Sequence, residues 1–96
     1  MSRNEREKVA ELGFQVGKEL ARINEPIIAR ITTLSKLNDF TTDIYTRWGR
    51  TVARDYADKI NRISYKIPYR DLWVYFLSDV RLGLVLESEE LWKEWH

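Results

Sequence analysis

Few side chains in this sequence are able to carry out a reaction. The sequence contains no Cys, and its one imidazole is His96 at the carboxyl end. Nucleophilic catalysis needs a Ser, Thr or Cys beside an activating base, and a helical di-metal site needs a Glu-x-x-His repeat. The sequence has neither pattern on a structured element, nor a phosphate-binding glycine loop or an EF-hand loop. We therefore predict that the protein is not an enzyme and has no catalytic residue, metal or cofactor.

The carboxylates are the next candidates for a polar site. Asp79 projects beside Leu72, Phe76 and Gly83 on a helical wheel, so its carboxylate would be partly desolvated. We expect a Lys or Arg of another helix to pair with Asp79, and the alternative is a raised pKa with a switching role. Four further acids cluster near the carboxyl end, where we expect a solvated helix face: Glu87, Glu89, Glu90 and Glu94.

Three arginines form the most distinctive polar pattern. Arg47, Arg50 and Arg54 follow one another at spacings of three and four, which places their guanidinium groups along one helix face. Asp43 and Asp58 lie four residues from Arg47 and Arg54, so two of the three arginines have an intrahelical partner. The pattern fits a salt-bridged solvated face, a contact with an acidic protein surface, or a contact with a phosphate backbone.

Helices must position all of these groups. Gly and Pro are scarce and long segments lack turn residues, which predicts an all-α chain. We predict one domain, an antiparallel three-helix bundle spanning residues 1–96, with helices at about residues 5–36, 39–63 and 68–94. Pro26 suits a break in the first helix, and Asn38 or Asp39 is the expected cap of the second. The last residues either continue the third helix or restart after Ser88 as a short fourth helix.

The first predicted helix carries three small residues one turn apart, Gly13, Gly17 and Ala21. Each Gly lowers helix propensity by up to about 1 kcal/mol relative to Ala, so something must come close to the helix there. We expect a neighbouring helix or a bulky Trp, and the alternative is a ligand-binding groove. Phe14 is expected either in a second core face or as an exposed anchor.

The third predicted helix is apolar around nearly its whole circumference. Two other helices of one bundle cannot cover such a helix, and soluble monomers seldom expose large apolar patches. We therefore predict a homo-oligomer or a complex with a larger protein. Trp92 and Trp95 share one face, which we expect to dock onto the protein's own bundle or onto another chain. The predicted interface residues are Trp73, Phe76, Leu77, Leu84, Trp92 and Trp95.

The function predicted from these features is a non-catalytic helical module for protein–protein interaction, such as an oligomeric scaffold, an adaptor, or a small inhibitor or accessory subunit. The alternative is a nucleic-acid-binding protein that uses the Arg47, Arg50 and Arg54 face. The net charge of +1 gives no overall field that would favour nucleic acid. The sequence shows no targeting signal or transmembrane segment, and we expect a cytoplasmic or intra-virion location.

Overall fold

Helices make up nearly all of the chain that the computed structural model describes, which is residues 2–51, 53–63 and 69–96. These residues form five helices and no strand. In chain order the helices are α1 (Ser2–Ile23), α2 (Glu25–Ile28), α3 (Leu34–Thr51), α4 (Ala53–Ile63) and α5 (Tyr69–Trp95). The all-α bundle predicted from the sequence is confirmed.

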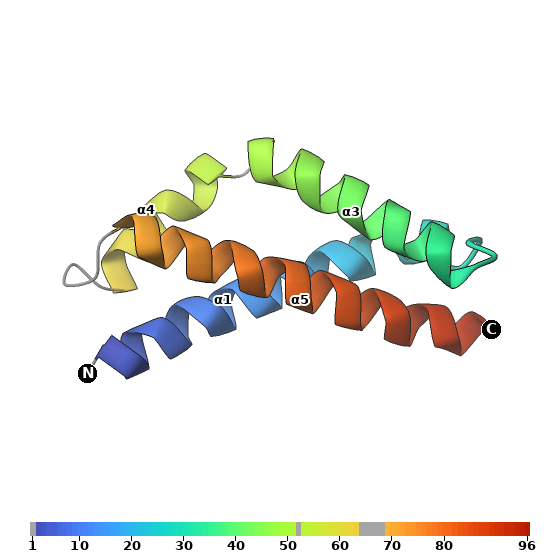
Figure 1. Ribbon diagram of the computed structural model, residues 1–96, viewed down its shortest axis with the longest axis horizontal. Helices are drawn as coiled ribbons and strands as arrows, with labels where there is room; N and C mark the ends of the chain where they lie inside the picture. Colours follow the sequence, from blue (N-terminus) through green and yellow to red (C-terminus); the bar gives the residue numbers. More distant parts are fainter. Residues whose placement is uncertain (1, 52, 64–68) are drawn as a thin grey trace.

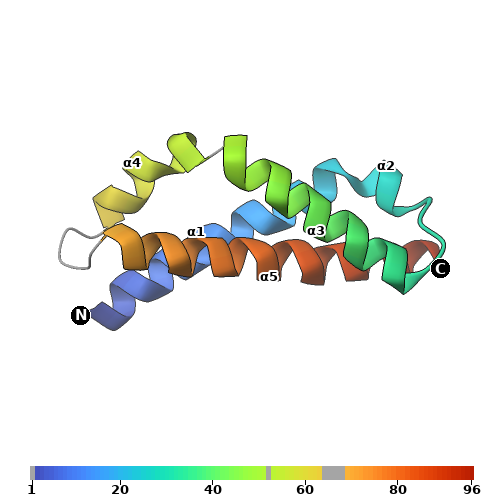
Figure 2. The same ribbon diagram turned by 45° about the horizontal axis from the view of Figure 1, so that its top comes forward.

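The first and last long helices, α1 and α5, form the centre of the fold and run in the same direction (Figure 1). Gly13 lies opposite Phe76 and Gly17 lies opposite Val80, so residue numbers rise together along the two helices. The chain returns between them through α3 and α4, which form an arch along α5 (Figure 2). The molecule is elongated, with dimensions of 45 × 24 × 18 Å.

The predicted first helix over residues 5–36 is too long. The helix breaks at Asn24, resumes with Pro26 in its first turn, and ends at Ile28. The chain then turns at residues 29–33, where Ile31, Thr32 and Thr33 are β-branched and disfavour a helix. The predicted break near Pro26 is confirmed, but the helix does not continue to residue 36.

The predicted cap of the second helix at Asn38 or Asp39 is also wrong. The backbone N–H of Lys36 donates a hydrogen bond of 3.2 Å to Oγ1 of Thr33, so Thr33 caps α3 and the helix begins at Leu34. Asn38 lies inside α3, where its carbonyl accepts hydrogen bonds from the Thr41 and Thr42 hydroxyls.

The later helix boundaries agree better with the sequence. The segment predicted as one helix over 39–63 contains the larger part of α3 and all of α4, and residue 52 between them lies outside the described residues. The predicted third helix over 68–94 is confirmed as α5, Tyr69–Trp95. It continues through Ser88, so the described residues contain no separate fourth helix after Ser88. The loop predicted at residues 64–68 lies outside the described residues.

Small residues bring α1 and α5 into backbone contact. A Cβ atom on Gly13 would overlap the Phe76 carbonyl oxygen, and one on Gly17 would overlap the Val80 carbonyl oxygen. From the other side, a Cβ atom on Gly83 would overlap the backbone of Phe14. The expectation that a helix packs on these small residues is confirmed. Because α5 occupies this surface, the alternative of a ligand-binding groove there is wrong.

The core has two parts along α5. The first includes an aromatic group in which the Tyr56 and Phe76 ring centroids are 5.4 Å apart and Trp48 lies 6.0 Å from both. Its buried residues are Val9, Val16, Trp48, Ile60, Leu72, Phe76 and Val80. The second part lies toward the carboxyl end and contains Ala21, Ile28, Leu37, Leu84 and Leu91. Side chains from α1, α2, α3 and α4 thus pack against α5, which contributes to both parts of the core.

Candidate functional site

Much of the predicted interface lies inside the protein's own core. Phe76 and Leu84 are 0% and 1% exposed, because α1, α3 and α4 cover this side of α5. Trp73 and Leu77 are half-buried and pack against the first core cluster, with the Trp73 ring stacked 5.3 Å from that of Phe76. These four side chains stabilise the bundle itself, so the candidate interface must be defined from other residues.

Trp92 docks onto the protein's own bundle. Its indole N–H donates a hydrogen bond of 2.9 Å to the carbonyl of Ile31, and its ring packs against the second core cluster. On the other side, the ring of His96 lies 4.8 Å from the Trp92 ring. Self-docking, one of the two possibilities considered for this Trp, is confirmed, and Trp92 holds the turn after α2 against α5.

Trp95 differs from Trp92 because it is 60% exposed. It lines an open cavity of about 460 Å³ together with Glu25, Pro26, Ala29 and Arg30 from α2 and the following turn. Large apolar side chains next to Pro26 are also exposed, with Ile23 at 75% and Ile27 at 51%. We call Ile23, Pro26, Ile27 and Trp95 the end patch.

A second apolar surface runs along the side of α5 that faces away from the other helices. Val74, Leu82 and Leu86 are 56%, 48% and 44% exposed, and the exposed Ser78 lies between the first two. The four residues follow one another at four-residue steps, which places them on adjacent turns of one helix face. We call Val74, Ser78, Leu82 and Leu86 the outer stripe.

Asp79 lacks the partner expected for it. It is half-buried beside Gly13, and no Lys or Arg of the described residues lies within ion-pair distance of its carboxylate. Burial raises the pKa of Asp79 above its ordinary value of 3.8. The expected salt bridge is therefore absent from the described part of the chain, and the alternative of a raised pKa is the one supported.

Glu87 pairs with two cations of α1, a role that the sequence interpretation does not include. Its Oε2 atom lies 3.3 Å from Arg22 and 3.8 Å from Lys18, both on α1, and its side chain is only 14% exposed. Glu87 is therefore an ion-pair link between α1 and α5 and not part of a solvated face. The four-residue spacing of Lys18 and Arg22 is the sequence signal that points to such a link. Glu90 and Glu94 are exposed as expected.

The arginine face is described only in part. Arg47 is exposed and pairs with Asp43 at 3.1 Å, as its four-residue spacing predicted. The side chains of Arg50 and Arg54 lie outside the described residues. The one arginine that is described therefore has an ordinary intrahelical partner, of the kind that contributes a few tenths of a kcal/mol.

The described residues contain neither a group of side chains that could hold a metal ion nor a helix that could span a membrane. Among residues 2–51, 53–63 and 69–96, no three His, Asp or Glu side chains come together in a way that could hold a metal ion. The helices described here do not include one that is both long and apolar enough to cross a bilayer. Comparison with protein-family models, with curated proteins and with solved structures finds no match to this chain.

Proposed function

We propose that this chain is a non-catalytic helical module for protein–protein interaction, acting as an oligomeric scaffold, an adaptor, or an inhibitor or accessory subunit. The outer stripe is the observation that carries the proposal. Its three apolar side chains are about half exposed on one face of α5, with Ser78 on the turn between Val74 and Leu82. Covering each of them is worth about 1 kcal/mol, because full burial of a Val or Leu is worth about 1.5–3 kcal/mol.

The position of the outer stripe supports this use. The other sides of α5 are covered by α1 and by α3 and α4, so the stripe lies on its remaining side and is accessible to another chain. Helices that are apolar on more than one side need more than one neighbour. The partner we propose is a second copy of the chain or a larger protein.

The proposal is tested by light scattering of the purified chain together with binding of a dye that fluoresces on apolar surfaces. We expect either a mass above the 11.5 kDa of one chain or strong dye binding. Leu82→Asn should lower the mass or the dye signal. Leu34→Asn is the matched control, because Leu34 is 49% exposed against 48% for Leu82 but lies at the start of α3. A strict monomer at high concentration without a dye signal would contradict the proposal.

The nucleic-acid alternative has less support. A phosphate-binding face needs cations that are available, and Arg47 is paired with Asp43. Binding of random-sequence DNA or RNA at low salt, lost steeply as salt rises, would favour this alternative over a protein partner.

A further inference from the structure

We infer that the end of the bundle formed by α2 and the last turn of α5 binds a basic amphipathic helix of another protein. The apolar face of that helix would cover the end patch, and its Lys or Arg side chains would pair with Glu25 and Glu94. The inference rests on the proposed function, to which it adds a second surface and the chemistry of a partner.

The end patch contains the two most exposed large apolar side chains of the described residues, Ile23 at 75% and Trp95 at 60%. Ile23, Pro26 and Ile27 follow one another at steps of three and one, and all three are exposed. Trp95 forms one wall of the adjoining open cavity, which has a volume of about 460 Å³. Trp and Arg, both present here, are the residue types that contribute most often to binding hot spots.

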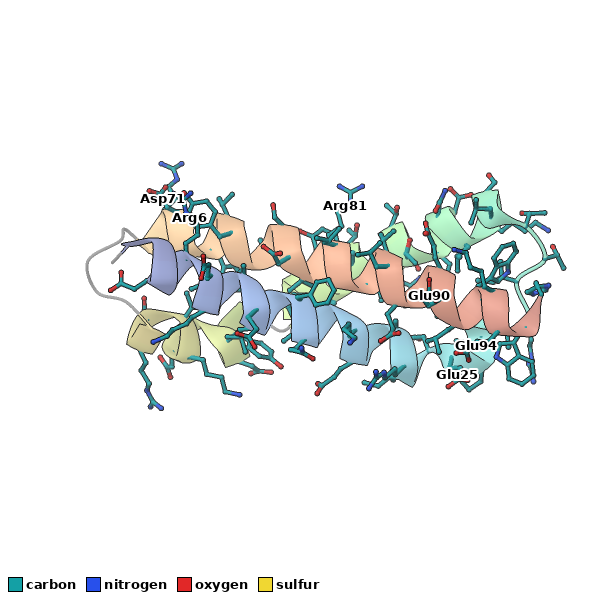
Figure 3. The ribbon with its side chains drawn as sticks, turned by 90° about the horizontal axis from the view of Figure 1, so that it is seen from below. Arg6, Glu25, Asp71, Arg81, Glu90 and Glu94 are labelled. Atoms are coloured by element: carbon teal, nitrogen blue, oxygen red, sulfur yellow. The ribbon has the colours of Figure 1, made fainter. Side chains whose placement is uncertain are left out.

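The charges around the end patch favour a basic partner. Glu25 lines the cavity, and Figure 3 shows Glu94 at the same end of the bundle. Neither carboxylate has an ion pair within the described residues. The neighbouring cations are already engaged, because Arg22 contacts Glu87 at 3.3 Å and Lys93 contacts Glu90 at 3.9 Å.

The cavity itself is lined by one acid, Glu25, and one base, Arg30. With Glu94, which lies outside the cavity at the same end of the bundle, two carboxylates without an ion pair among the described residues stand against one guanidinium. A Lys or Arg side chain of a partner would make two favourable interactions at this end of the bundle. It would pair with a carboxylate, and it would stack on the exposed Trp95 indole, which attracts ammonium and guanidinium groups. The same carboxylates would repel a phosphate backbone or an anionic membrane, which separates this surface from a nucleic-acid interface.

An amphipathic helix is the partner geometry that fits the spacing of the apolar residues in the end patch. An amphipathic helix presents apolar side chains every three or four residues with charged side chains along both borders. Glu25 lines the cavity beside Pro26 and Trp95, and Figure 3 shows Glu94 at the same end of the bundle, so one such helix would bring apolar and basic groups to this end together.

Two synthetic helical peptides test the inference with the full chain. Each is about 18 residues long with Leu on one face, and the other face is Lys in one peptide and Glu in its counterpart. Fluorescence anisotropy of the labelled peptides measures the affinities. We expect the Leu–Lys peptide to bind at least about tenfold more tightly than the Leu–Glu peptide, with a dependence on salt.

Substitutions then locate the binding. Trp95→Ala should weaken Leu–Lys peptide binding about tenfold. Glu25→Gln combined with Glu94→Gln should weaken it about threefold and reduce its salt dependence. The matched control is Glu11→Gln combined with Glu19→Gln, which removes the same two charges from exposed positions of α1 and should leave binding unchanged.

Each of the following results would overturn the inference. They are equal binding of the two peptides, full binding by the Trp95→Ala chain, or loss of binding only in the Leu82→Asn chain, which would assign the peptide to the outer stripe. If neither peptide binds while light scattering or dye binding is positive, the end patch is not the site but the proposed function stands. If all of these measurements are negative, both fail.

Discussion

Gly17→Ala should destabilise the bundle, although Ala is the better helix former. Gly17 lies where α1 crosses α5, and an added Cβ atom would overlap the Val80 carbonyl oxygen and lie 2.6 Å from the amide nitrogen of Leu84. Both are backbone atoms of a helix, so neither can rotate out of the way as a side chain can. The two helices must move apart instead.

The expected size of the effect is the difference between two terms. Replacing Gly by Ala inside a helix gains about 1 kcal/mol in an open position. Forcing an extra carbon into a close-packed contact costs about 3 kcal/mol, at the upper end for overpacking, because the added carbon meets backbone on the opposite helix. The net loss is about 2 kcal/mol, which lowers the Tm of a chain of this size by about 10 °C.

The assay is thermal unfolding followed by circular dichroism, with Gln15→Ala as the control. Gln15 is exposed on the same helix, so its substitution tests helix propensity alone and should change the Tm little or raise it slightly. An unchanged or raised Tm for Gly17→Ala would refute the close approach of α1 and α5, and with it the arrangement at the centre of the fold.

Three further predictions concern single polar groups. Burial raises the pKa of Asp79, so the folded state binds the carboxyl proton more tightly than the unfolded state, and stability falls as pH rises above the ordinary pKa of 3.8. Asp79→Asn should therefore raise the Tm at pH 7 but not below pH 3.8. An equal change in Tm at both pH values would rule out a raised pKa as the cause. The hydroxyl of Ser88 is fully buried without a hydrogen-bond partner among the described groups. Ser88→Ala should therefore raise the free energy of unfolding, measured in urea, by about 1 kcal/mol. A loss of stability would show that the hydroxyl does have a hydrogen-bond partner. Trp92→Phe removes the hydrogen bond to the Ile31 carbonyl and should lower the same free energy by about 1–2 kcal/mol, whereas an unchanged value would mean that the turn after α2 is held by apolar packing alone.

The sequence predicted those parts of the fold that depend on local pattern. Apolar periodicity located α5 to within one residue at each end, and the spacing of Gly13 and Gly17 indicated a close helix contact. The end of the first helix was missed because the apolar stripe continues through Ile27 and Ile31, which suggests an unbroken helix. The competing signal is Thr33, whose hydroxyl caps α3 in place of the expected Asn38 or Asp39.

The candidate site was harder to predict because a helical wheel shows which residues are apolar and not which neighbours cover them. Phe76 and Leu82 lie on the same apolar helix, yet Phe76 is fully buried and Leu82 is 48% exposed. The difference depends on where α1 and α4 pack, and this is set by contacts between segments distant in sequence. Among the predicted interface residues, Trp95 is the one that is mostly exposed, at 60%.

The pairing of α1 with α5 has a consequence for how the protein is made. Gly17 meets Val80, so the two sides of the central crossing are separated by more than half of the chain. During synthesis α1 is made before α5, so its apolar side, with Val9 and Val16, lacks its main partner helix until the end of the chain has been made. Local helices form quickly, but the core must wait for this distant contact. The central crossing can therefore close only after the last helix has been made, so we expect the core to form after translation of α5 and not during synthesis of the earlier helices.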